Sequence, residues 1–101
     1  MSDLVNVLIL GRHPSLSKHV LEILAEAGIT GKSSNTVEGA IDLARSEHFD
    51  VLLLGGAVTL EEERLAVAGV KEVLPEIKVK RRDLYSNDGP VEHVRAALAG
   101  T

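Results

Sequence analysis

Two short apolar runs, each ended by glycine, constrain this chain more than any other feature of its sequence. The first run is Leu4–Leu10 (LVNVLIL) before Gly11, and the second is Phe49–Leu54 (FDVLLL) before Gly55 and Gly56. Continuous apolar runs of this length are typical of parallel strands buried on both faces, whereas strands with one solvated face alternate apolar and polar residues. Both runs therefore predict central strands of a parallel sheet.

A helix is predicted after the first of these strands. Pro14 is suited to a first helical turn, and Gly28 is a typical residue just beyond a helix end. The stripe expected to face inward follows the helical period: Leu16, Val20, Ile23, Leu24 and Ala27. Ser15 and Ser17 are assigned to capping of this helix, without a chemical role.

Two further helices are marked by capping-box patterns, Asn35 with Glu38 and Thr59 with Glu62. The helix after Thr59 is expected to end at Pro75. Its negatively charged first turn, with its Glu61–Arg64 run, is predicted to be a solvated surface. The inner face of this helix is predicted from the helical period: Ala66, Val70, Val73 and Leu74.

The remaining segments predict two weaker strands and a last helix. Ile29–Ser33 (ITGKS) and Ile77–Lys80 (IKVK) are interrupted by polar residues, and lysines on an edge strand discourage pairing with another chain. A helix starting at Pro90 is expected to turn three residues inward: Val91, Val94 and Leu98.

The order of elements predicts an α/β three-layer sandwich of the flavodoxin-like class. Short connections between alternating strands and helices require right-handed crossovers onto one parallel sheet. With the two apolar strands in the middle, the predicted strand order is 2-1-3-4. The sequence does not decide whether the sheet has a fifth strand. Residues 1–101 are expected to form a single domain, in line with the length of the chain.

Composition excludes several classes of function. The chain has no cysteine, so disulfides and cysteine-bound metals are impossible, and its formal net charge of -4 disfavours a general nucleic-acid binder. His19, His48 and His93 have no metal-ligand spacing, so neither a metal site nor a cofactor is expected. The absence of a basic leader and of any long apolar run predicts a cytoplasmic protein that does not enter membranes.

Ligands of open parallel sheets bind beyond the carboxyl ends of the strands, where the strand order reverses. Here that point lies between the first and third strands, and arginine from the fourth could reach it. The candidate ligand- or anion-binding residues are Gly11, Arg12, His13, Gly55, Gly56 and Arg82. The simpler alternative is that Arg12 is solvated and His13 only precedes a helix. His13 is also weighed as a phosphoryl acceptor, as in small phosphocarrier proteins.

Three segments resemble the receiver domain of two-component response regulators. These are "VLILGRHP", "AEAGITGKSSNTVEGAIDLARSEHFDVLLLGG" and "GPVEHVRAAL". The resemblance implies a bacterial signalling module with a parallel sheet of the order already predicted. The family has a further strand and helix between the equivalents of Pro75 and Pro90, and this chain is too short there by about one βα unit.

The residues that carry receiver chemistry are replaced in this chain. The resemblance places Gly55 at the phospho-acceptor aspartate, and Gly11 and Arg12 at the acidic pair that binds magnesium. In the family, the hydroxyl of a Thr or Ser and a lysine before a proline read the phosphoryl group. In this chain, Arg81–Arg82 stands near the position of the hydroxyl, and Gly89 occupies the position of the lysine. A hard cation bound at phosphate needs carboxylate oxygens. We therefore expect a degenerate pseudo-receiver that cannot form an aspartyl phosphate.

The function expected from these observations is a non-enzymatic signalling or protein-interaction module that acts through a recognition face. By resemblance, that face lies along the last strand and helix, and the partner is another protein or a second copy of the chain. The predicted interface residues are Lys80, Tyr85, Val91, Val94 and Leu98. The alternative is a sensor of a small ligand or anion at the ends of the first and third strands.

Overall fold

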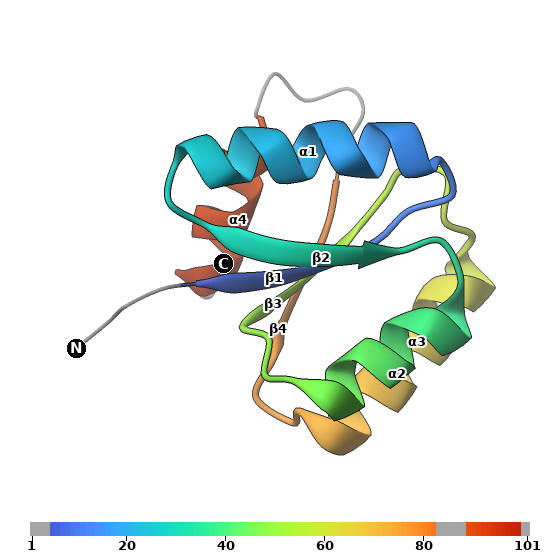
Figure 1. The fold of residues 1–101 in the computed structure, drawn as a ribbon. Coiled ribbons are helices and arrows are strands. Elements are labelled where there is room, and N and C mark those ends of the chain that lie inside the picture. Colours follow the sequence, from blue (N-terminus) through green and yellow to red (C-terminus); the bar gives the residue numbers. More distant parts are fainter. Residues whose placement is uncertain (1–4, 83–88, 100–101) are drawn as a thin grey trace.

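The computed structural model describes residues 5–82 and 89–99, in which strands and helices alternate along the chain (Figure 1). The strands are β1 (Asn6–Leu10), β2 (Thr30–Ser34), β3 (Val51–Leu54) and β4 (Lys78–Arg81). The helices are α1 (Pro14–Glu26), α2 (Val37–Ser46), α3 (Leu60–Val73) and α4 (Pro90–Leu98). The predicted succession of elements is confirmed, with strand boundaries shifted by one or two residues.

The strands form one parallel sheet in the order β2-β1-β3-β4, as predicted. Val7 of β1 stands opposite Val51 of β3, and this register continues to Leu10 opposite Leu54. These paired segments are at most 3% exposed, whereas most residues of the two outer strands are partly or fully exposed. Because burial of an aliphatic side chain contributes roughly 1.5–3 kcal/mol, the most apolar strands occupy the centre.

Two helical layers cover the sheet, with α1 and α4 on one face and α2 and α3 on the other (Figure 1). Successive side chains of a strand point to opposite faces. Val7 and Ile9 consequently pack with Val20 and Leu24 of α1 and with Val94 of α4. Leu8 of the same strand packs in the other core, against α2 and α3.

Strand β4 is the last strand of the sheet within residues 5–82 and 89–99. It pairs with β3 alone, and the chain then reaches α4 on the same face as α1 (Figure 1). This part of the chain therefore has the four strands that the sequence predicted. The fifth strand that was left open is not found within residues 5–82 and 89–99.

The helix ends confirm most of the capping predictions. Gly28 adopts φ +80°, a conformation that costs residues with a Cβ, directly after the C-cap of α1. At α3, the Thr59 side chain accepts from the backbone N–H of Glu62, and the Glu62 carboxylate accepts from the N–H of Thr59. The Asn35 prediction is wrong by one residue, because Thr36 caps α2 by accepting from the N–H of Gly39.

Four residues predicted to face inward are exposed instead, and Ala27 at the end of α1 is one of them. Leu16 is 58% exposed, Val73 37% and Leu98 41%, so these assignments are wrong. In α1 the buried stripe is Ser17, Val20 and Leu24. The rotation of a helix about its own axis decides which residues face the sheet, and the periodicity of the sequence does not contain that rotation.

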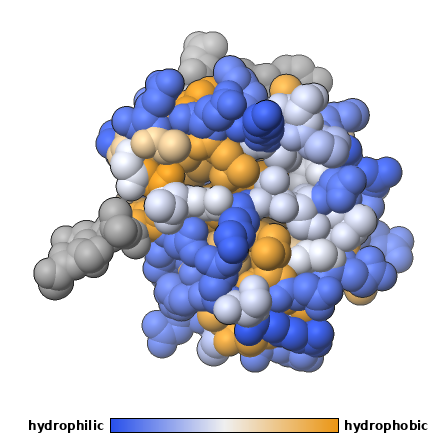
Figure 2. All heavy atoms as spheres, viewed as in Figure 1, coloured by the Kyte–Doolittle hydropathy of each residue, from blue (hydrophilic) through white to orange (hydrophobic). Residues whose placement is uncertain are grey.

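Polar residues cover most of the face seen in Figure 2, and apolar surface gathers between α1 and the edge strand β2. Among the described residues, no helix has the length and apolar character that crossing a membrane would require.

Candidate functional site

A cavity of about 280 Å³ lies beyond the carboxyl ends of β1 and β3, at the end of the sheet where α1 begins. All six residues predicted for an anion or ligand site line it: Gly11, Arg12, His13, Gly55, Gly56 and Arg82. We call this space the carboxyl-end cavity. The other lining residues are Ile9, Leu16, Ser17, Val20 and Ala57. The structure thus brings together residues that are up to 73 positions apart, from Ile9 to Arg82.

The floor of the carboxyl-end cavity is made of glycine backbone. A Cβ on Gly55 would lie 3.3 Å from the Cα of Gly11, which is tighter than ordinary contact. A Cβ on Gly11 would lie only 2.7 Å from the Oγ of Ser17. The backbones of the β1 and β3 ends therefore pack directly on each other, and the Ser17 hydroxyl lies against this floor.

Ser17 is the residue that the sequence analysis misassigned here. It does not cap α1, since the N-cap is His13 and no side chain caps that end of the helix. Ser17 lies within the first turns, is only 5% exposed, and lines the cavity. The Ser17 hydroxyl forms no hydrogen bond with the described chain. The sequence signal that could have revealed its burial is the spacing of Ser17 from Val20 and Leu24, which places it on the same helical face.

The N-terminus of α1 opens onto the same cavity. Backbone N–H groups in the first turn of a helix have no partner within the helix, and the helix dipole places partial positive charge there. Pro14 brings no N–H, and those of Ser15 and Leu16 form no hydrogen bond within residues 5–82 and 89–99. With no acidic residue in this turn, the end of the helix favours an anion.

Arg12 stands at the rim of the cavity and is held by α3. Its guanidinium donates to Glu62 at 2.6 Å, in an ion pair whose side chains are 47% and 31% exposed. Glu62 also caps α3, and the hydrogen bond from the backbone of Thr59, with the Arg12 guanidinium, lowers the pKa of this carboxyl. Within the Glu61–Arg64 run predicted to be a solvated surface, Glu62 is partly exposed and also links α3 to the cavity rim.

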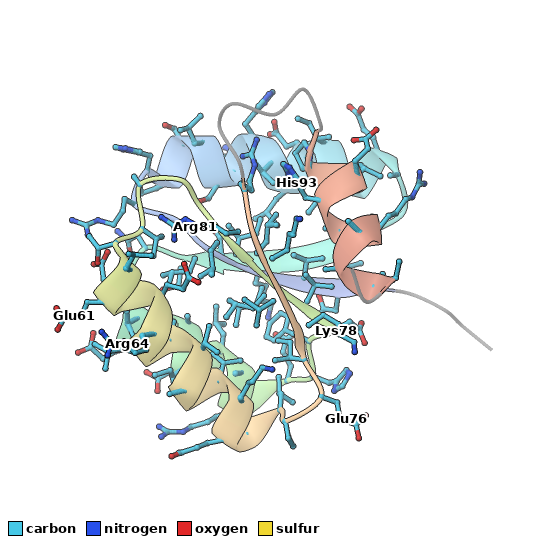
Figure 3. The ribbon with its side chains drawn as sticks, turned by 180° about the vertical axis from the view of Figure 1, so that it is seen from behind. Glu61, Arg64, Glu76, Lys78, Arg81 and His93 are labelled. Atoms are coloured by element: carbon cyan, nitrogen blue, oxygen red, sulfur yellow. The ribbon has the colours of Figure 1, made fainter. Side chains whose placement is uncertain are left out.

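The two consecutive arginines at the end of β4 point to opposite faces of the sheet. Arg81 lies on the α3 side, where it donates to Glu63 at 2.5 Å and to the carbonyl oxygens of Val58 and Gly56 (Figure 3). Glu63, like its neighbour, is thus engaged rather than free in solvent. The charge of Arg81 is compensated outside the cavity.

Arg82 instead lines the cavity on the α1 side. Its backbone N–H donates to Leu54 O at 2.8 Å, which places the residue beside the end of β3. The Nε of its guanidinium is buried, and no hydrogen bond or ion pair joins this side chain to the described chain. A buried donor without a partner costs about 1–3 kcal/mol, and no described carboxylate compensates the charge of Arg82.

Four of the predicted interface residues belong to α4 and β4, and none of these four lines the cavity. Lys80 and Val91 are half-buried and Leu98 is exposed. Val94 is 0% exposed in the core between α4, β1 and β3, so its assignment to an interface is wrong. The α4 stripe turns Val94 and Ala97 inward, which leaves Leu98 outside. Tyr85 lies outside the described residues.

Nothing in the described ranges groups three or more histidine or acidic side chains as a metal site would need. None of the eleven cavity-lining residues carries a carboxylate. The described lining offers cationic and N–H groups, which are the groups that bind and orient an anion.

Comparison with solved structures shows what this architecture is similar to. A response regulator from Burkholderia pseudomallei, with a phosphorylated aspartic acid, a calcium ion and citrate, matches with TM-score 0.69 at 15% identity, over 90% of this chain. The chain spans only 54% of that protein's length. A response regulator from Thermotoga maritima matches with TM-score 0.68 at 16% identity, over 95% of this chain and 77% of its own.

A third structure, described as a transiently phosphorylated switch in bacterial signal transduction, matches with TM-score 0.64 at 18% identity, over 96% of this chain and 73% of that one. The fold is receiver-like. No protein-family model matches the chain, and no curated protein matches its sequence. The receiver-like fold predicted from the sequence is thus confirmed.

The two neighbouring arginines lead to opposite expectations for stability. Replacing Arg81 with methionine is expected to lower the free energy of unfolding by about 1–2 kcal/mol, since it leaves Glu63 and the carbonyl of Val58 without their donor. Replacing Arg82 with methionine is expected to leave it unchanged or to raise it, because a buried unpaired donor is removed. Urea unfolding of both variants measures the difference. Equal destabilisation would show that Arg82 is paired in solution.

The ionised form of Glu62 is expected to stabilise the fold in a pH-dependent way. Because its pKa is lowered from the model-compound value of 4.5 in the folded state, its contribution is full above that value and is lost as pH falls through the folded-state pKa. Glu62→Gln keeps a capping side chain but removes the charge. Its destabilisation should be clear at about pH 7 and should vanish toward about pH 3 in urea titrations.

Glu61→Gln is the matched control for that measurement. Glu61 is an exposed carboxylate in the same helical turn that points away from the protein (Figure 3). Its substitution should change the free energy of unfolding little at any pH. A Glu62→Gln effect that persists undiminished in acid would contradict the role given to its charge.

Proposed function

We propose that this chain is a receiver-like signalling module that forms no aspartyl phosphate and acts by recognition, without catalysis. The observation that carries the proposal is the end of β3. Gly55 occupies the position that follows the strand, and a Cβ there would lie 3.3 Å from the Cα of Gly11, which is tighter than ordinary contact. Neither of these two positions supplies a carboxylate that could accept a phosphoryl group or bind magnesium. We also propose that the protein is cytoplasmic.

Asp50, the aspartate nearest β3 in the sequence, supports the same conclusion. It lies at the amino end of that strand, opposite the carboxyl-end cavity. Its carboxylate accepts from the N–H of Asn6 at 2.9 Å and is 3.2 Å from Nε2 of His48. These contacts give Asp50 a structural role at the amino end of the sheet. The cationic groups that line the carboxyl-end cavity lie at the other end of the strands.

Acetyl phosphate tests this proposal directly. After incubation of the chain with acetyl phosphate and magnesium, intact mass spectrometry should show no gain of a phosphoryl group. Gly55→Asp is also expected to stay unmodified, since an aspartate there has no acidic neighbours to hold the metal. A phosphoaspartate in the wild-type chain would overturn the proposal, and so would an acid-labile adduct that disappears in His13→Ala.

The recognition face that we propose is the surface of α4 next to the edge strand β4. Leu98 is a large apolar residue left exposed there, and Lys80 and Val91 are only half-buried. Contiguous apolar patches surrounded by polar residues are typical of protein-contact surfaces, and we assign Leu98 to such a patch. The partner that fits this face most simply is a second copy of the chain, related by two-fold symmetry.

Light scattering over a concentration series tests this pairing. The wild-type chain is expected to give a dimer mass, and Leu98→Glu should shift it to the monomer because a charge is then placed in an apolar contact. Leu60→Glu serves as control, since Leu60 is 75% exposed on α3, away from α4. A monomer at every concentration would contradict the homodimer.

A second candidate function is a sensor of a small anion at the carboxyl-end cavity. It is favoured by one observation, the unpaired guanidinium of Arg82 beside the free N-terminus of α1. Binding there could change the rim that Arg12 and Glu62 connect to α3. This candidate needs no phosphoryl transfer, so it is compatible with the recognition function.

A further inference from the structure

We propose that the carboxyl-end cavity binds the dianion of an organic phosphate monoester whose organic part is small and apolar or aromatic. This inference rests on the sensor candidate above, and it adds the chemical class of the ligand. Three properties of the cavity carry it: its charge, its unused donors and its apolar wall.

The charge of the cavity is positive although the chain as a whole has a formal net charge of -4. Arg82 contributes a full positive charge that no described carboxylate compensates. The N-terminus of α1 adds about half a charge of the same sign. Arg12 is neutralised by Glu62 at the rim, and none of the described lining residues is acidic. A dianion matches these sources better than a monoanion does.

The unused hydrogen-bond donors are arranged for several oxygens at once. Ser17 is only 5% exposed, and its hydroxyl has no hydrogen-bond partner in residues 5–82 and 89–99. The Nε of Arg82 is buried and unpaired as well. Backbone N–H groups of the lining residues Leu16, Gly56 and Ala57 form no hydrogen bond within the same ranges.

These donors come from three separate chain segments that meet around the glycine floor. A planar carboxylate offers two oxygens, whereas a phosphate monoester offers three terminal oxygens that can each accept from a different segment. The convergence of hydroxyl, guanidinium and backbone donors therefore favours a phosphate over a carboxylate.

The size and the apolar wall of the cavity point to an organic substituent. A volume of about 280 Å³ equals roughly nine water molecules at about 30 Å³ each, which is more than a bare phosphate fills. The apolar part of the lining includes Ile9, Val20 and Ala57. Leu16 also lines the cavity and is 58% exposed, so it can cover an apolar group at the mouth.

Calorimetric titration of the whole chain at about pH 8 with phenyl phosphate, phenyl sulfate and inorganic phosphate tests the inference. Phenyl phosphate is a dianion there and phenyl sulfate a monoanion of nearly the same shape. Phenyl phosphate is expected to bind about tenfold or more tightly than phenyl sulfate, and more tightly than inorganic phosphate, because it uses both charge and apolar wall.

Three variants locate the binding. Arg82→Gln should weaken phenyl phosphate about tenfold or more, and Ser17→Ala about fivefold, because each removes a hydrogen bond to a charged ligand. Arg64→Gln is the control with the same loss of charge, since Arg64 is exposed on the outer side of α3 (Figure 3). It should leave the affinity unchanged. Thermal unfolding of each variant shows that the fold is retained.

The outcomes separate this inference from the function on which it rests. Equal affinities for phenyl phosphate and phenyl sulfate, both lost in Arg82→Gln, would overturn the phosphate monoester and keep the anion sensor. If none of the three anions binds, or if binding is the same in Arg82→Gln and in Arg64→Gln, both the ligand class and the sensor function are wrong.

Discussion

The pairing of β1 with β3 is the constraint on which the rest of the structure depends. Both strands are buried on both faces, so each residue of Val7–Leu10 and Val51–Leu54 packs against a helix and against the neighbouring strand. Because the strands are parallel and in register, they end together, with the backbones of Gly11 and Gly55 in contact. The carboxyl-end cavity exists because two core strands stop side by side at glycine.

Much of the fold could be predicted from the sequence because it is written in local patterns. The two apolar runs indicated the central strands, and weak hydrophobicity indicated the edges, so the strand order followed from which segments most need burial. Capping at Thr59 and the turn at Gly28 were predictable for the same reason, since each depends on residues close in the chain. The location of the cavity followed from the strand order.

What the sequence could not indicate depends on orientation in three dimensions. Arg81 and Arg82 are neighbours of identical type, and only the pleat of β4 against α3 decides which one meets Glu63. The depth of Ser17 depends on how α1 is rotated on the sheet, and a shift of one residue exchanges it with the exposed Leu16. The same rotation in α4 buries Val94 and leaves Leu98 outside.

The electrostatics of this site arise from ion pairing rather than composition. The first turn of α3 supplies two acids to the end of the sheet, and each is engaged by an arginine from another element: Glu62 by Arg12 and Glu63 by Arg81. Both pairs lie at or outside the rim, so the acidic turn satisfies two cations without entering the cavity. Arg82 lines the cavity beside residues of α1, and no described carboxylate pairs with it. An acidic protein can in this way present a positive interior site, because its carboxylates are held by the fold where they cannot neutralise it.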